Sequence, residues 1–409
     1  CPRAEQVRPP ARNNFAPLNK MPRCLEVFCG TKSVSKQLGP EWEVVSVDLF
    51  AKFEPTICAD VHEWDYKAAF PPGHFDYVHL SPPCTEFSRA LTTRPRRLEV
   101  GDALAEKALE IVEYFQPRWW TLENPATGEL PKRPYMEAWK PYMRTVCYCK
   151  YNDDGKHPYK KPTAIWTNLR HWEPRPMCNV QTPCADVAER GAHSQVAQLG
   201  PGRKRGMHDS STHSKTQLYS IPGALIREWI WQMQCDRLLE MLVGTTWPRV
   251  CRRLNIVAPE HRQYNRAGAE RRCLVETKSM ALSSRNRRCK GIYDLVWQML
   301  PQAYKDAHGE GEYFIATVNK NVQCYPHKDA RNVGETVVLF LGDYSGGTLC
   351  LEDGRRIDKR RCWHFYRGSE LEHWNEPHTG DKYSVIASFN DRPIWWGAAA
   401  SAEESGQQD

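Results

Sequence analysis

Short apolar runs, separated by glycine, proline and charged residues, fill the first half of the chain. They occupy residues 24–28, 43–48, 75–80 and 119–122, and a short helix is expected at 34–38. Continuous apolar runs of this length are typical of buried parallel strands. The backbone N–H groups at the start of that helix suit the polar end of a cofactor. The pattern predicts an α/β domain.

A different pattern follows residue 312. β-type runs at 313–318, 336–341, 347–351, 362–366 and 383–389 are short, and glycines at 342–347 indicate a turn. Regular short strands of this kind predict a small antiparallel barrel or jelly roll. A length of 409 residues suits two domains.

Polar residues stand where the first apolar runs end. Phe28 and Gly30 lie in a tight turn after the first run, and Asp48 ends the second run about twenty residues later. Nucleotide-binding α/β folds place an acidic residue there, against ribose hydroxyls. Asp60 ends the following segment. These positions predict a mononucleotide-type cofactor site.

A Ser-Pro-Pro-Cys motif at residues 81–84 follows the third run, and Glu123 and Asn124 follow the fourth. Consecutive prolines fix φ and remove two backbone donors, so the loop presents Cys84 on a rigid support. A cysteine packed as a small hydrophobe is the alternative interpretation. A presented thiol near a carboxyl group suits nucleophilic attack.

The Phe-Cys-Gly turn at 28–30, Asp48, Asp60, the Ser-Pro-Pro-Cys motif and Glu-Asn-Pro at 123–125 occur in an order that resembles the DNA (cytosine-5) methyltransferases. The resemblance covers residues 22–235 and implies a Rossmann-like α/β methyltransferase domain. It implies S-adenosylmethionine as the cofactor, contacted by Phe28, Gly30, Asp48, Asp60 and Pro82.

The same resemblance implies that Cys84 adds to carbon 6 of a cytosine flipped from the DNA helix, while Glu123 contacts ring nitrogen 3 and the exocyclic amine. Asn124, Lys161 and Thr163 are the other expected substrate contacts, the last two in place of a missing Gln-x-Arg-x-Arg motif. Residues 159–168 resemble compact phage-type members. Lys32 departs from the family, which has a second glycine there.

His327 and Asp329 form a His-x-Asp pair, and His373 follows 44 residues after Asp329. Two histidines and one carboxylate form a ligand face that leaves open positions on non-haem Fe(II). The spacing therefore predicts a metal site in the second half.

Residues 317–321, 325–332 and 341–349 resemble the TET/JBP branch of the 2-oxoglutarate/Fe(II) dioxygenases, over roughly residues 275–392. The resemblance implies a double-stranded β-helix, Fe(II) held by His327, Asp329 and His373, and oxidation of 5-methylcytosine to 5-hydroxymethylcytosine. It also implies that Lys382 binds 2-oxoglutarate where arginine is usual. His378 is a rival distal ligand, but His373 reproduces the family's spacing to the basic residue.

The expected organisation has a disordered segment at 1–21, a methyltransferase-like domain at 22–235, a basic linker at 236–274, a dioxygenase-like domain at 275–395 and a disordered tail at 396–409. Residues 236–290 hold thirteen Lys/Arg against five Asp/Glu. This segment suits sequence-independent phosphate contacts or a solvated linker equally well.

Sixteen cysteines without an apolar signal segment indicate a reducing compartment. Cys178, Cys184 and His193 could join Cys147 or Cys149 around zinc, although no C-x-x-C pair is present. Scattered reduced cysteines and a surface histidine are the alternative.

Together the two halves predict an enzyme that methylates cytosine carbon 5 in DNA and oxidises the product. An RNA cytosine methyltransferase and a decayed enzyme kept as a DNA-binding module are the alternatives. The net charge of +7 agrees with a nucleic-acid partner. No membrane span and no protein partner are indicated, and we expect an intracellular protein, nuclear in a eukaryote. The chain begins with Cys1, so N-terminal targeting is not readable.

Overall fold

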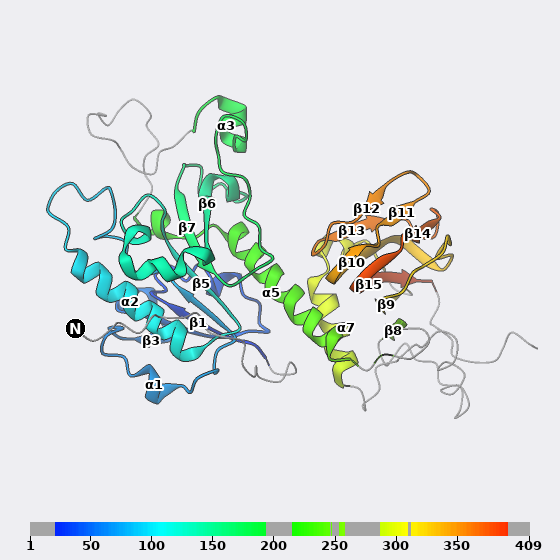
Figure 1. Ribbon diagram of the computed structural model, residues 1–409, viewed down its shortest axis with the longest axis horizontal. Helices are drawn as coiled ribbons and strands as arrows, with labels where there is room; N and C mark the ends of the chain where they lie inside the picture. Colours follow the sequence, from blue (N-terminus) through cyan, green and yellow to red (C-terminus); the bar gives the residue numbers. More distant parts are fainter. Residues whose placement is uncertain are drawn as a thin grey trace, which may run out of the picture. The chain divides into compact units, whose positions relative to one another are not determined.

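The computed structural model describes residues 21–193, 215–245, 247, 253–257, 287–309 and 312–391 (Figure 1). The chain divides into two compact units, Cys1–Met233 and Gln234–Asp409. The segments expected to be disordered at the two termini lie outside the described residues, except for Met21. Within the described ranges, no helix combines the length and the apolar character needed to cross a membrane.

The first unit is built on a mixed seven-stranded sheet with the order β3-β2-β1-β4-β5-β7-β6. Its strands are β1 (Arg23–Val27), β2 (Glu43–Asp48), β3 (Ile57–Cys58), β4 (Tyr77–Leu80), β5 (Trp119–Pro125), β6 (Met143–Cys147) and β7 (Pro162–Thr167). The first five are parallel, whereas β7 is antiparallel to both β5 and β6. The carboxyl ends of the parallel strands therefore share one edge of the sheet.

Successive side chains of these strands enter different hydrophobic cores, because side chains alternate across a sheet. Leu25 and Val78 pack in a core with the helix α2 (Leu98–Phe115). Their neighbours Cys24 and Tyr77 pack in another core with the first part of α5 (Gly223–Val243). Burial on both faces explains why the runs are continuously apolar.

The remaining helical segments of the first unit are short. They are α1 (Tyr66–Ala69), α3 (Ala185–Arg190), α4 (Lys215–Tyr219), and the 3-10 helices η1 (Ser35–Gln37), η2 (Ala51–Phe53), η3 (Leu130–Lys132), η4 (Pro134–Tyr142) and η5 (Tyr148–Tyr151). The helix expected at 34–38 is thus only the single 3-10 turn η1.

The second unit contains two antiparallel sheets, one of five strands (β13-β10-β15-β9-β8) and one of three (β12-β11-β14). The strands are β8 (Arg253–Val257), β9 (Tyr313–Lys320), β10 (Asn332–Gly346), β11 (Leu349–Leu351), β12 (Arg356–Ile357), β13 (Trp363–Tyr366), β14 (His373–Asn375) and β15 (His378–Asn390). Val338 and Phe340 of β10 share a core with Leu349 and Leu351 of β11, so the two sheets pack face to face.

Two helices, α7 (Arg287–Met299) and α8 (Gln302–Asp306), pack on the larger sheet. Trp297 of α7 lies 5.0 Å from Phe314 of β9, measured between ring centroids, and Tyr304 of α8 lies 5.9 Å from Phe365 and 5.8 Å from Phe389. These aromatic contacts bury apolar surface of the sheet.

Parts of the segment expected as a linker at 236–274 have regular structure. α5 continues to Val243, and Arg253–Val257 forms β8, which pairs with β9. The tertiary pairing of β8 could not be read from its basic composition. The rest of this segment, apart from 244, 245 and 247, lies outside the described residues.

The glycine-rich stretch at 342–347 also differs from the expected turn, because most of it continues β10 and pairs with β15. Gly342 has a φ of +105°, and a Cβ atom there would lie 2.0 Å from the carbonyl oxygen of Asp381. A glycine inside a strand permits this close approach of two backbones. The stretch is therefore an irregular strand, and the chain turns only after Gly346.

We predict that Gly342→Ala destabilises the second unit by about 3–5 kcal/mol, since it combines backbone strain with a steric clash. Gly354→Ala is the matched control, because Gly354 also has a positive φ but no atom within 4 Å of an added Cβ. It should cost only about 1–2 kcal/mol. Denaturant unfolding of both variants measures the difference, and equal losses would contradict the assigned close approach.

Candidate functional sites

Three residues in the turn after β1 adopt the left-handed backbone conformation. Phe28, Gly30 and Lys32 have φ values of 55°, 45° and 55°. Glycine adopts this conformation freely, whereas a lysine there is strained by about 1–2 kcal/mol. The Lys32 ammonium donates to the carbonyl of Glu54 and does not line the cavity described below. Lys32 thus keeps the backbone shape that a glycine would give.

Glu26, which sequence reasoning overlooked, occupies the start of η1. Its carboxylate accepts hydrogen bonds from the backbone N–H groups of Val34 (3.0 Å) and Ser35 (2.9 Å), and from the Ser35 hydroxyl. Burial raises the pKa of Glu26, and the bonds from Ser35 and Val34 oppose this shift. The expectation that these N–H groups serve a cofactor is therefore wrong, because a buried side chain already uses them.

A cavity of about 800 Å³ opens at the carboxyl ends of the parallel strands. The predicted residues that line it are Phe28, Gly30, Asp48, Asp60, Pro82, Cys84, Glu123 and Lys161. The carboxylate of Asp48 accepts from the N–H groups of Gly30 (2.9 Å) and Phe50 (2.9 Å), so it fixes the loops after β1 and β2. The shared strand edge explains why these distant positions in sequence meet.

Buried hydrogen bonds hold the loop that carries Cys84. Asn124 donates from Nδ2 to the carbonyl of Pro82 at 2.9 Å. His79, at the other side of the loop, contacts Ser81 Oγ at 2.9 Å and Thr121 Oγ1 at 2.7 Å. Burial lowers the pKa of His79 to about 3, so its imidazole is neutral. The loop is thereby held at Ser81, just before the prolines, and at the first proline, Pro82.

The electrostatic surroundings of Cys84 keep its thiol protonated. Burial raises the pKa of Cys84, the negative charge of Glu123 raises it further, and Lys161 lowers it. Reaction as a nucleophile requires the thiolate. Binding of a substrate that neutralises or screens Glu123 would therefore favour ionisation of Cys84.

Glu123 is held by Tyr148, which directly follows β6, and by Lys161, which directly precedes β7. Its Oε1 accepts from the Tyr148 hydroxyl at 3.0 Å and lies 3.8 Å from Lys161 Nζ. Lys161 Nζ also lies 4.6 Å from the Tyr148 ring centroid and donates to the carbonyl of Leu218 at 2.9 Å. Sequence reasoning missed Tyr148, since only the pairing of β6 with β7 brings it to this edge.

Asn124 and Thr163, expected as substrate contacts, are fully buried and do not line the cavity. Thr163 Oγ1 donates to the carbonyl of Lys161 at 3.2 Å. Both side chains thus donate to backbone carbonyls beside the site. Asn124 supports the loop that carries Cys84, and Thr163 bonds to the backbone of Lys161.

In the second unit, His327, Asp329 and His373 come together with their ligand atoms within 4.8 Å of one another. The Asp329 carboxylate lies 3.7 Å from His327 Nε2 and 3.5 Å from His373 Nε2. A β-bridge joins the backbones of the two histidines. His378 lies outside this cluster.

Each histidine of the cluster is oriented by a backbone carbonyl. Nδ1 of His327 lies 2.7 Å from the carbonyl of Tyr325, and Nδ1 of His373 lies 3.0 Å from that of Leu371. A carbonyl only accepts, so both Nδ1 atoms carry the proton and both Nε2 atoms are left as ligands. This orientation is common in metal-binding histidines. The donor set fits Fe(II).

Lys382 of β15 is a buried cation, with 2% of its surface exposed. Its ammonium donates to the carbonyl of Gly347 and lies 5.0 Å from the Phe340 ring centroid and 5.6 Å from that of Tyr344. Burial lowers its pKa to about 8. No carboxylate in the described part of the chain pairs with it, so the site suits an anionic ligand.

Comparison with known proteins supports the assignment of the first unit. No protein-family model matches the chain. The chain is 32% identical over 225 residues to the "Probable DNA (cytosine-5)-methyltransferase" of Frog virus 3 (isolate Goorha), and the match covers 50% of this chain and 97% of the viral protein.

Two solved structures are similar to the chain at lower identity. An oxidoreductase of the 2OG-Fe(II) oxygenase family from Burkholderia pseudomallei is 14% identical, with 26% of this chain and 59% of that chain covered and a TM-score of 0.22. NgTET1 in complex with 5mC DNA is 10% identical, with 39% and 67% covered and a TM-score of 0.26. At these scores the assignment of the second unit rests on its own geometry. The identity that spans nearly the whole viral relative shows that the chain belongs, through its N-terminal half, to the DNA (cytosine-5)-methyltransferase family.

Proposed function

We propose that the first unit methylates carbon 5 of cytosine in DNA and that the second unit oxidises the methyl group to hydroxymethyl. The observation that carries the first activity is the single cavity that joins Cys84 and Glu123 to Phe28, Asp48 and Asp60. The cavity is large enough for a cofactor and a flipped base side by side. Residues 22–235 would form a Rossmann-like domain, and residues 275–395 a double-stranded β-helix.

Each residue of the first site has a distinct part in the proposed reaction. Cys84 adds as a thiolate to carbon 6 of the base and leaves again when the proton on carbon 5 is removed. Glu123, oriented by Tyr148, accepts from the exocyclic amine and, in its protonated form, donates to ring nitrogen 3, and so neutralises the negative charge that develops on the ring when Cys84 adds. S-adenosylmethionine supplies the methyl group, and Phe28, Asp48 and Asp60 would hold it. Lys161 pairs with the Glu123 carboxylate before the base binds, and its positive charge favours ionisation of the Cys84 thiol once the base is bound.

The second site is proposed from its donor set. His327, Asp329 and His373 would hold Fe(II), which supplies oxidising chemistry together with dioxygen and 2-oxoglutarate. The buried ammonium of Lys382 would bind the far carboxylate of 2-oxoglutarate, which explains a cation in an apolar setting. The Lys32 side chain does not line the cavity, and Lys382 is buried beside the rings of Phe340 and Tyr344, so neither departure from the families favours a decayed enzyme.

We predict that Cys84→Ala lowers methyl transfer at least about a thousandfold, because it removes the nucleophile. S-adenosylmethionine binding should stay within about threefold of wild type, since the thiol acts on the base. Cys58→Ala, which removes an exposed thiol of the same unit, is the control. Transfer of a labelled methyl group to DNA and to RNA measures the effect and separates the two substrates. A near wild-type rate in Cys84→Ala contradicts the proposed chemistry.

For the second unit, we expect His373→Ala to abolish hydroxymethylcytosine formation from methylated DNA with Fe(II), ascorbate and 2-oxoglutarate. His378→Ala should lose less than about tenfold, because His378 lies outside the ligand cluster. Both variants should methylate normally, because the first unit does not use this cluster, and circular dichroism that matches the wild type should show that the second unit is folded. Mass spectrometry of nucleosides gives the result, and the reverse order of effects would move the distal ligand to His378.

Lys382→Met should weaken 2-oxoglutarate binding by about 5- to 150-fold, corresponding to about 1–3 kcal/mol. It should also stabilise the second unit near pH 7, since it removes a buried charge. The folded pKa of about 8 lies below the ordinary 10.5, so the unfolded state binds more protons between these values. Wild-type stability should therefore rise between pH 8 and 10.5, and this rise should shrink in Lys382→Met. Denaturant unfolding across this range checks the sign, and an unchanged profile contradicts the burial of a charged Lys382.

A further inference from the structure

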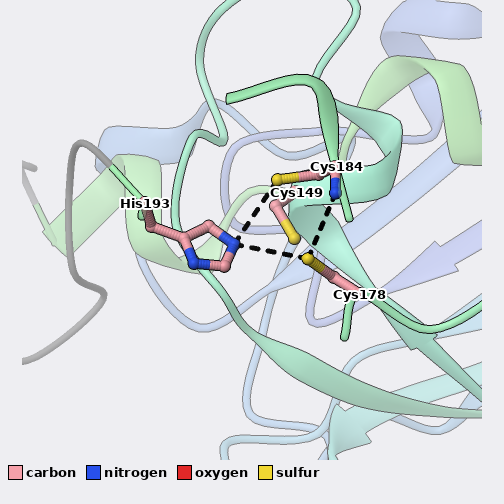
Figure 2. Close-up of side chains that lie close together, drawn as sticks. All are labelled: Cys149, Cys178, Cys184 and His193. Carbon is pink, nitrogen blue, oxygen red and sulfur yellow. Dashed lines mark hydrogen bonds between the residues drawn. The ribbon is translucent and has the colours of Figure 1, made fainter. Parts of the chain in front are cut away.

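A second group of metal-ligating side chains lies in the first unit, apart from the catalytic cavity. Cys149 is in η5, directly after β6. Cys178 and Cys184 lie at the two ends of a short loop, and His193 follows the C-terminus of α3. Figure 2 shows the three sulfur atoms and Nε2 of His193 pointing toward one another. Three separate segments of the chain thus converge on one point.

The distances between these atoms match a tetrahedral metal site. Nε2 of His193 lies 3.6 Å from Cys178 Sγ and 3.5 Å from Cys184 Sγ, and all four ligand atoms lie within 4.8 Å of one another. Zn–S bonds of about 2.3 Å and Zn–N bonds of about 2.0 Å place tetrahedral ligand atoms about 3.5–3.8 Å apart. The cysteines are free thiols, so disulfide bonds do not account for their convergence.

Hydrophobic packing does not explain why the loop between Cys178 and Cys184 and the helix α3 are ordered. The cysteines Cys147, Cys149, Cys178 and Cys184 form a small core whose only partly buried neighbours among the described residues are Met177 and Val187. α3 has six residues, and Val180 in the loop is 91% exposed. This small amount of buried apolar surface offsets only a small part of the conformational entropy that is lost when the loop becomes ordered. A metal ion would supply the missing stabilisation.

The surroundings of the sulfur atoms also suit metal-bound thiolates. The backbone N–H of Cys184 donates to Cys178 Sγ at 3.3 Å. The loop between them is closed by Asn179, whose Oδ1 accepts from the N–H groups of Gln181 (2.9 Å) and Thr182 (2.8 Å). Lys150 Nζ donates to the carbonyl of Pro183 at 2.9 Å. Three thiolates around Zn²⁺ leave one net negative charge, which this nearby ammonium offsets.

We propose that Cys149, Cys178, Cys184 and His193 bind one zinc ion in a closed structural site. Protein atoms fill all four positions, so the ion has no place for a substrate. The site ties the loop and α3 to the turn that begins with Tyr148, the residue that bonds to Glu123. The proposal rests on the local geometry alone and does not depend on the proposed function.

Cys147 provides a matched control. Its Sγ lies 3.3 Å from Cys149 Sγ, and it is equally buried, but it is outside the four-residue set. The spacing of residues in the sequence left Cys147 and Cys149 as alternative ligands, whereas the structure selects Cys149.

Cobalt(II) titration of the metal-free full chain tests the site. We expect one equivalent of cobalt to give the absorption of tetrahedral cobalt and a thiolate-to-cobalt charge-transfer band, both removed by one equivalent of zinc. The His327, Asp329 and His373 cluster has no thiolate and cannot give that band. Cys178→Ser and Cys149→Ser should bind zinc at least about a hundredfold more weakly, and Cys147→Ser should keep the band.

The wild-type spectrum tests whether thiolates bind the metal ion, even if a cysteine variant does not fold. Cobalt binding without a thiolate band overturns the proposal. A band that survives in Cys149→Ser and disappears in Cys147→Ser overturns the ligand set.

Discussion

The common direction of β1, β2, β3, β4 and β5 is the constraint on which the first site depends. Parallel strands deliver their carboxyl ends to one edge, so loops that are far apart in sequence open into one cavity. Lys161 directly precedes the antiparallel strand β7, and it lies at this edge because β7 begins opposite the carboxyl end of β5. Hydrogen bonds that Asp48 accepts and that Asn124 and Tyr148 donate then fix the loops and Glu123 relative to Cys84.

In the second unit, backbone contacts fix the positions of the ligand side chains. There the bridge between His327 and His373 joins the segment before β10 to β14, and backbone carbonyls set both imidazoles. Lys382 comes from β15 and is held in an apolar setting that an anionic ligand would relieve. Both proposed chemistries concern carbon 5 of a pyrimidine and its substituent, so the product of one unit is the substrate of the other.

The parts of the sites that sequence reasoning predicted lie in contiguous motifs. Residue type and local pattern were enough to predict the loop of Cys84, the acid at Asp48 and the pair His327 and Asp329. Such local patterns can be read from the sequence without knowledge of the tertiary contacts. Glu26 and Tyr148 were missed because their roles arise from contacts that depend on the fold. Non-local pairing also explains β8 within a basic segment and the continuation of β10 through its glycines.

The central claim is that the two units act in sequence on the same carbon atom. Its most direct test supplies the full chain with unmethylated DNA, Fe(II), ascorbate, 2-oxoglutarate and S-adenosylmethionine whose methyl group carries carbon-13. Mass spectrometry of the nucleosides should find the label first in 5-methylcytosine and then in 5-hydroxymethylcytosine. Labelled 5-methylcytosine that accumulates with no labelled 5-hydroxymethylcytosine would contradict the claim.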